Sequence, residues 1–246
     1  MSPDSSEVSW RAVSACLARA LENPDAAALS LLVRRDEDAL AEARARDALR
    51  ALAPGDAPLA GMTLGVKACF DVQGWTTHAG SRVLSGAPAA AEDAPLVRRL
   101  RRAGAVLLAQ NNMTEFAFGA LGLNAAFGTP LTPCMTDSPR VAGGSSSGGA
   151  VAVALGMVNL AVVSDTSGSA RIPAAFCGVA GFKPSRGRYP DGGMTYLSPT
   201  FDVPGIIAAD VAQCLRVDKA LVPREAQSPA PAGRGAAPLA GRSFVV

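Results

Sequence analysis

The stretch GGSSSGGAVAVALGMVNLAVVSDTSGSARIP, residues 143–173, contains two turns rich in serine and glycine with an apolar segment between them. The first turn, residues 143–149, opens onto an apolar run that predicts a helix to about Met157. Residues 160–163 have the composition of a buried strand, and the second turn follows that strand directly. This alternation of helix and strand is typical of α/β proteins.

The same alternation extends towards the amino terminus. Apolar runs at residues 62–70 and 105–109 predict strands, and residues 92–103 between them predict a helix. Residues 1–55 are rich in alanine, leucine and arginine and predict a helical segment, broken by the pair Asn23-Pro24. We therefore divide the rest of the chain into a core at 56–221, a Pro/Ala-rich linker or surface loop at 222–240 and the start of a further strand at 241–246.

Composition narrows the class of protein. The 246 residues are 49% apolar with a formal net charge of +2, which indicates a sizeable core and gives no reason to expect a nucleic-acid partner. The arginines within 98–102 interleave with Leu100 as on the solvated face of a helix. The longest apolar stretch, residues 150–163, is too short to span a membrane, and the start lacks the pattern of a secretion signal. Five scattered cysteines favour neither disulfides nor zinc, so we expect a cytoplasmic protein.

The single histidine, His78, limits the chemistry that the chain can carry out. A metal site built on several histidines is excluded. The segment around Ser146 matches the Gly-x-Ser-x-Gly turn of α/β-hydrolases, but that fold needs a histidine later in the chain and none follows. Neither glycine-rich turn continues as Gly-Lys-Ser/Thr, so a phosphate-binding loop is excluded too. A serine nucleophile in this chain therefore needs a proton acceptor other than histidine.

Lys67 is the candidate acceptor. Only three of the 23 basic residues are lysines, and a lysine, unlike an arginine, can lose its proton. Lys67 lies in the apolar strand pattern at 62–70, where burial would lower its pKa. The alternative is a strand-end lysine whose stem is buried while its amine reaches water.

The second serine-rich turn offers a nucleophile and an anion site together. Residues 165–169 follow a predicted strand directly and include Ser169. A tight turn there can direct successive backbone N–H groups towards one point beside the serine hydroxyl and so form an oxyanion hole. The alternative is an ordinary loop, because loops of serine and glycine are common.

Together these features resemble the amidase signature family. The resemblance runs from about residue 58 to residue 211 and includes Lys67, with Ser145 and Ser169 lying 24 positions apart. The motifs that carry it are NMTEFAFG at 112–119, FG at 127–128, GGSSSGG at 143–149, DTSGSARIP at 165–173 and CGVAGFKP at 177–184. The resemblance implies an amidase fold with a central mixed β-sheet flanked by helices.

The resemblance also implies roles for the site residues. Ser169 would be the acyl-forming nucleophile, Ser145 the bridging serine entered through a cis peptide bond, and Lys67 the terminal base. Arg171 would organise the loop. The oxyanion would be bound by the backbone N–H groups of Thr166, Ser167, Gly168 and Ser169. The implied activity is hydrolysis of a carboxylic amide, a small molecule, through an acyl-serine intermediate, with no cofactor and no metal.

The chain departs from the family pattern at a few positions. An acid commonly follows the lysine where this chain has Ala68, small residues are common at Val163 and Ser167, and an arginine is expected near Ala209. Segments 187–190 and 197–205 are most similar to the mandelamide and indoleacetamide hydrolase branch. That similarity implies a small aryl-acetamide as substrate.

Two alternatives to a stand-alone amidase stay open. One is a transamidating amidotransferase subunit that works in a complex with a glutaminase activity. The other is a truncated, catalytically silent scaffold that binds a partner, favoured by the altered pair Ala68-Cys69. The chain stops within the strand-like run at 244–246, so we expect a carboxyl-terminal part to be missing. The apolar edge that this would uncover makes a homodimer the candidate assembly.

Overall fold

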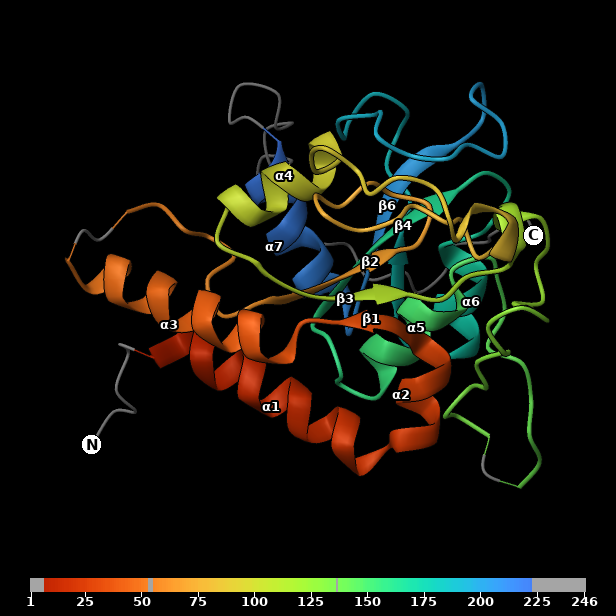
Figure 1. Ribbon diagram of the computed structural model, residues 1–246, viewed down its shortest axis with the longest axis horizontal. Coiled ribbons are helices and arrows are strands. Elements are labelled where there is room, and N and C mark those ends of the chain that lie inside the picture. Colours follow the sequence, from red (N-terminus) through yellow and green to blue (C-terminus); the bar gives the residue numbers. More distant parts are fainter. Residues whose placement is uncertain (1–6, 53–54, 136, 223–246) are drawn as a thin grey trace, which may run out of the picture.

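A six-stranded mixed β-sheet forms the centre of the molecule (Figure 1). The structure is a computed structural model that describes residues 7–52, 55–135 and 137–222. Its strands, in the spatial order β1-β3-β2-β4-β6-β5, are β1 (Leu31–Arg34), β2 (Thr63–Lys67), β3 (Val106–Asn111), β4 (Leu160–Asp165), β5 (Ala180–Phe182) and β6 (Val203–Ala208). The three central strands β3, β2 and β4 are parallel, and the outer strands pair antiparallel with their neighbours. The predicted fold class is confirmed.

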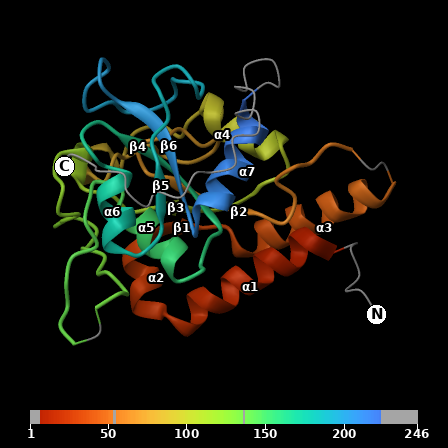
Figure 2. The same cartoon turned by 180° about the vertical axis from the view of Figure 1, so that it is seen from behind.

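Helices cover both faces of this sheet, as the two opposite views show (Figures 1 and 2). The described α-helices are α1 (Val8–Glu22), α2 (Pro24–Ser30), α3 (Asp36–Leu52), α4 (Pro95–Arg102), α5 (Ser147–Ala154), α6 (Arg171–Phe176) and α7 (Val211–Leu221). One hydrophobic core contains residues of α1, α2, α3, α5 and α6, and the other contains residues of α4 and α7. Along β4, Val162 belongs to one core while Ala161 and Val163 belong to the other, as strand geometry dictates. Each fully buried valine stabilises the fold by roughly 1.5–3 kcal/mol.

The pairing of β2 with β4 positions the site. Leu64 lies opposite Leu160 and Val66 opposite Val162, so the two parallel strands end at the same edge of the sheet. Side chains that follow the carboxyl ends of parallel strands gather at such an edge. Lys67, the last residue of β2, therefore lies near the end of β4.

The predicted amino-terminal helical segment contains one strand, which is a correction. The spacing of leucines and valine around residue 32 is close to helical, yet Leu31–Arg34 forms β1 and pairs antiparallel with β3. Pairing with an existing strand outweighs local periodicity because it provides backbone hydrogen bonds to a run of four residues. The expected break is present, since Pro24 is the first residue of α2.

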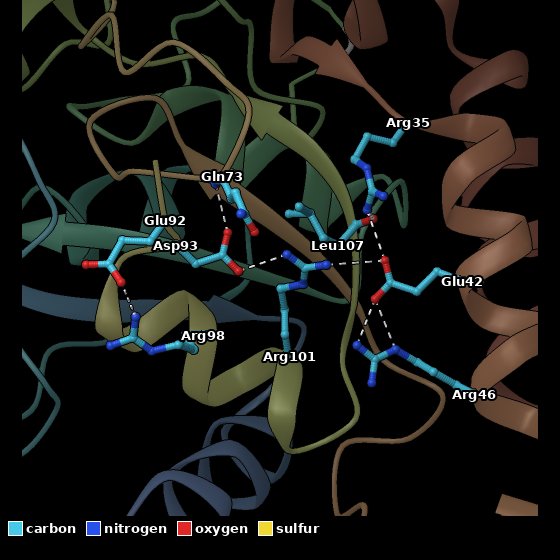
Figure 3. A network of polar contacts seen from close by, with 9 residues as sticks. All are labelled: Arg35, Glu42, Arg46, Gln73, Glu92, Asp93, Arg98, Arg101 and Leu107. Atoms are coloured by element: carbon cyan, nitrogen blue, oxygen red, sulfur yellow. Dashed lines mark hydrogen bonds and ion pairs between the residues drawn. The ribbon is translucent and has the colours of Figure 1, made fainter. Parts of the chain in front are cut away.

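A carboxylate between three arginines connects α3 to α4 beneath the sheet edge (Figure 3). Glu42 accepts hydrogen bonds from Arg35 at 3.0 Å and Arg46 at 2.7 Å, and Arg101 of α4 lies 3.6 Å away. Arg101 also donates to Asp93 at 2.8 Å. Burial opposes ionisation of Glu42, but the hydrogen bonds from the arginines outweigh it and its pKa is lowered. The outward face of α4 is thus solvated and paired with acids, as its arginine pattern predicts.

Some predictions concern residues that the structure does not describe. The predicted linker, apart from Val222, and the predicted strand start at 241–246 lie outside the described residues. Within the described part, none of the helices has both the length and the apolar character needed to cross a membrane.

Candidate active site

Lys67 is sealed inside the protein and contacts two serine hydroxyls. Its Nζ donates to Ser145 Oγ at 2.7 Å and to Ser164 Oγ at 2.8 Å. The side chain is fully buried, which rules out the strand-end alternative in which the amine reaches water. Burial lowers the pKa of Lys67, although Cys69, Asp202 and Asp165 act in the opposite direction. A lysine with a lowered pKa is suited to proton transfer.

Ser145 is held by the turn that precedes α5. The Gly144–Ser145 peptide bond is cis, as the sequence predicts. Gly144 N–H donates to Ala120 O at 2.7 Å, and Thr114 N–H donates to Ser145 O at 2.9 Å. A side chain at Gly144 would lie 2.6 Å from the backbone nitrogen of Gly122, so only glycine fits there. These backbone contacts fix the Ser145 hydroxyl beside Lys67.

The loop that carries Ser169 is organised around the buried carboxylate of Asp165. Arg171 forms a two-point ion pair with Asp165, with Nε–Oδ2 at 3.0 Å and Nη2–Oδ1 at 2.8 Å. Burial opposes ionisation of Asp165, but the Arg171 hydrogen bonds and backbone N–H groups outweigh it and lower its pKa. The loop contacts the first turn through a hydrogen bond from Ser146 N–H to Ser169 O at 3.2 Å. The two serine-rich turns therefore lie side by side.

Three of the four expected oxyanion donors are free, and one is not. Gly168 N–H donates to Asp165 Oδ1 at 2.8 Å, so the expectation that it faces an oxyanion needs correction. Among the described residues, the N–H groups of Thr166, Ser167 and Ser169 have no hydrogen-bond acceptor. Asp165 captures the fourth group because a buried carboxylate needs donors and Gly168, at φ +141°, turns its N–H back towards it.

Two residues of the site were missed from the sequence. Ser164 is the second hydroxyl on Lys67, and its position just before the Asp165 turn is the only signal that could have found it. Asp202 accepts a hydrogen bond from the Thr166 hydroxyl. Its other carboxylate oxygen accepts N–H groups of Leu197 at 2.7 Å and Ser198 at 3.1 Å. Nothing in the local sequence indicates that Asp202, 36 residues away, supports the Thr166 turn.

The positions where the chain departs from the family pattern fit their surroundings. Val163 is buried where the facing residue is Gly149, whose added Cβ would lie 3.5 Å from Val163. Ser167 is exposed, and its backbone is not in the left-handed region, so the turn does not require glycine there. Ala68 is buried without a polar group, so no acid follows the lysine.

The single histidine has a structural environment. His78 Nδ1 accepts Gly80 N–H at 3.1 Å, which leaves Nε2–H to donate to Gln110 Oε1 at 3.0 Å. The ring stacks on Phe127 with the centroids 4.8 Å apart. Burial lowers the pKa of His78, so the neutral ring is favoured. Both ring nitrogens are occupied, and neither contacts a serine of the site.

A buried amine bonded to a serine, with a second serine beside open N–H groups, is suited to acyl transfer without histidine. The chain belongs to the Amidase family, whose sequence profile matches residues 11–235. The resemblance drawn from the motifs is thus confirmed.

Individual relatives include both hydrolases and transferases. The chain is 49% identical over 155 residues to AtzE of the 1-carboxybiuret hydrolase of Pseudomonas sp. (strain ADP), covering 63% of this chain and 34% of that protein. It is 41% identical over 216 residues to a glutamyl-tRNA(Gln) amidotransferase subunit of Moorella thermoacetica, covering 87% and 44%. The native peptide amidase of Stenotrophomonas maltophilia superposes with a TM-score of 0.77 at 34% identity, covering 88% and 45%. The chain spans less than half the length of each.

Proposed function

We propose that this chain carries the site of an amidase that cleaves a carboxylic C–N bond through an acyl-serine intermediate. The observation that carries the proposal is the 2.7 Å hydrogen bond between Lys67 Nζ and Ser145 Oγ in a fully buried setting. In this proposal Ser169 is the nucleophile, Ser145 relays its proton and Lys67 is the base. A lysine serves here because burial favours its neutral form.

The proton path has one contact to complete. Among the described residues no hydrogen bond joins the hydroxyls of Ser145 and Ser169, although Ser146 N–H binds Ser169 O at 3.2 Å. Catalytic hydrogen bonds are often completed only when substrate binds, and a rotation of the Ser169 side chain would do so. Ser169 Oγ then bonds to the carbonyl carbon while its proton passes through Ser145 to Lys67. The reverse transfer protonates the departing amine, and water releases the acid.

The oxyanion that forms at the carbonyl would lie against open backbone N–H groups. Those of Thr166, Ser167 and Ser169 are the proposed donors, and Gly168 contributes its flexible backbone instead of its N–H. The loop does not need to reorganise during the reaction because Asp165 and Arg171 already fix it.

The substrate is proposed to be a small amide with an apolar acyl group, such as an aryl-acetamide. Phe118 and Leu121 are exposed, at 80% and 56%, on the loop whose Ala120 carbonyl binds Gly144. Such apolar side chains near the serines favour an apolar acyl group. We propose no nucleic-acid or membrane partner, and a homodimer as the assembly to test. Five unpaired cysteines support a reducing, cytoplasmic location.

An activity-based probe tests the nucleophile. A fluorophosphonate is expected to add one label to the wild-type chain and none to Ser169→Ala, as read by intact mass. Ser167→Ala is the matched control, because it removes the neighbouring exposed hydroxyl but keeps the backbone N–H. Label that persists in Ser169→Ala and maps to Ser146 would contradict the proposal and favour the Gly-x-Ser-x-Gly alternative.

A second candidate function is that of an amidotransferase subunit, which the similarity to the glutamyl-tRNA(Gln) amidotransferase of Moorella thermoacetica favours. The discriminating assay compares hydrolysis of an aryl-acetamide with hydrolysis of glutamine by the chain alone. A stand-alone amidase prefers the aryl-acetamide, whereas an amidotransferase component prefers glutamine. A chain that folds but neither takes the probe nor hydrolyses either amide would be the silent scaffold.

A further inference from the structure

Cys69 closes a buried chain of polar contacts that begins at Lys67. Its side chain is 1% exposed, and its Sγ lies 3.8 Å from Ser164 Oγ. Ser164 Oγ in turn lies 2.8 Å from Lys67 Nζ. Among the described residues, Lys67 and Cys69 are the only side-chain partners of the Ser164 hydroxyl. The mechanism proposed above uses Lys67 and leaves Ser164 and Cys69 without a role.

The direction of the Ser164 hydroxyl matters to a lysine that acts as a base. A neutral amine has one lone pair and two N–H donors, and the lone pair must face Ser145 to take its proton. The Ser164 hydroxyl can accept an N–H from Lys67 or donate its own proton to the lone pair. In the second case it competes with Ser145 for the only basic site.

We propose that Cys69 is a positioning residue for Lys67: its sulfur accepts the Ser164 proton, so that Ser164 accepts an N–H from Lys67 and the lone pair stays directed at Ser145. The inference rests on the proposed base role of Lys67. A thiol sulfur is a weak acceptor, but in a buried site it is the acceptor that Ser164 has.

The charges that face Lys67 are compatible with this role. Asp165 and Asp202 favour the protonated amine from the end of β4 and the start of β6. Asp165 is paired with Arg171, and Asp202 binds Thr166 and two backbone N–H groups. Burial raises the pKa of Cys69, so the thiol is neutral and acts through its hydrogen bond instead of its charge.

The direct test is the titration of Lys67 by NMR in protein labelled with ¹³C at lysine. The chain has three lysines, so the Cε signals are few, and Lys183→Arg assists their assignment. In Cys69→Ala the freed Ser164 proton is expected to bond to the lone pair and stabilise the neutral amine. The Lys67 pKa should fall by about 0.5–1 unit, the size of one weak hydrogen bond.

The same variant should change the pH profile of turnover. The acid limb of kcat/KM is expected to move to lower pH, because the amine loses its proton earlier. The plateau should fall about tenfold, because the lone pair is diverted from Ser145. Cys69→Ser, which keeps an acceptor, should retain the wild-type profile. Cys69→Val fills the volume without an acceptor and should match Cys69→Ala, which separates the hydrogen bond from the effect of a cavity.

Two further variants make the test specific. Cys16 is also buried, and its Sγ lies 3.2 Å from the Thr63 hydroxyl, so Cys16→Ala removes a similar contact away from Lys67 and should leave the titration unchanged. In a Ser164→Ala background, Cys69→Ala should have no additional effect, because the link is already broken.

An unchanged Lys67 titration in Cys69→Ala and Cys69→Val would overturn the inference. A Cys69 effect that persists in Ser164→Ala would overturn it too. Absence of amide turnover in the wild type would instead contradict the proposed function, while the NMR titration would still decide whether Cys69 sets the proton equilibrium of Lys67.

Discussion

Two buried charged side chains of this protein have opposite surroundings. Glu42 lies among three arginines, two of which donate hydrogen bonds to it at 2.7 and 3.0 Å. Lys67 is more deeply buried, yet its hydrogen-bond partners are the neutral hydroxyls of Ser145 and Ser164. The pKa of each group is lowered, which favours the charged form of the acid and the neutral form of the amine.

The difference shows where the fold fixes a charge and where it leaves a proton mobile. The Glu42 network holds α3 against α4, and its role requires a permanent charge (Figure 3). Around Lys67, the nearby carboxylates Asp165 and Asp202 are turned to Arg171 and Thr166. No described acid forms an ion pair with Lys67. An amine without a counter-ion can accept and return a proton at little cost.

The largest effect is expected from Lys67→Arg, which keeps the positive charge but cannot act as a base. Turnover should fall by about 10³-fold or more, because general-base catalysis is lost. The measurement is kcat/KM on an aryl-acetamide, with circular dichroism to confirm the fold. Near-normal rates in a folded variant would remove Lys67 from the mechanism.

The next effect is expected from Asp165→Asn, which weakens the ion pair with Arg171 and the contact with Gly168 N–H. Because the Arg171 side chain is 51% exposed, the loss should be about 2 kcal/mol and below that of a fully buried pair. Urea unfolding at neutral pH measures it. Asp191→Asn, at an exposed carboxylate, is the control and should change stability by less than about 0.5 kcal/mol.

Glu42→Gln should cost about 1–2 kcal/mol at pH 7, and less at low pH. Since the folded-state pKa of Glu42 lies below its ordinary value, its ionised form contributes stability above that value, and the contribution disappears as the pH falls through the folded pKa. The difference between wild type and variant should therefore shrink from pH 7 to pH 3. Glu22→Gln, in an exposed pair with Arg19, should show little difference at either pH.

The smallest effect is expected from His78→Gln. Burial lowers the pKa of His78, so the folded state resists protonation and loses stability as the pH falls below the ordinary histidine value near ~6.5. The urea midpoint of the wild type should therefore fall more between pH 7.5 and 5.5 than that of the variant, by less than about 1 kcal/mol. A variant whose turnover collapses at both pH values would contradict the structural role of this histidine.

The sequence predicts best what depends on neighbouring residues. The alternation of helix and strand, the burial of Lys67 and the two turns follow from apolar runs and from glycine and serine positions. Contacts between distant segments were missed. The strand Leu31–Arg34 forms because β3 is there to pair with it, and the roles of Ser164 and Asp202 depend on which strands become neighbours.

The capture of Gly168 N–H by Asp165 shows a further limit. A motif indicates that a turn offers N–H groups, but the direction of each group depends on backbone angles that one sequence does not contain. Competition for donors inside a crowded loop was therefore visible only in three dimensions.

The sheet order also determines when the site can form as the chain folds. Lys67 and Ser164 are 97 positions apart, and β4 completes its pairing only with β6, which ends at Ala208. Contacts of such large sequence separation form slowly and together, after the local helices. The Lys67–Ser145–Ser164 cluster therefore cannot assemble in a partly folded intermediate that lacks the central strands. If Ser169 is the labelled serine, the rate at which a refolding sample gains reactivity towards the probe reports the formation of the whole sheet.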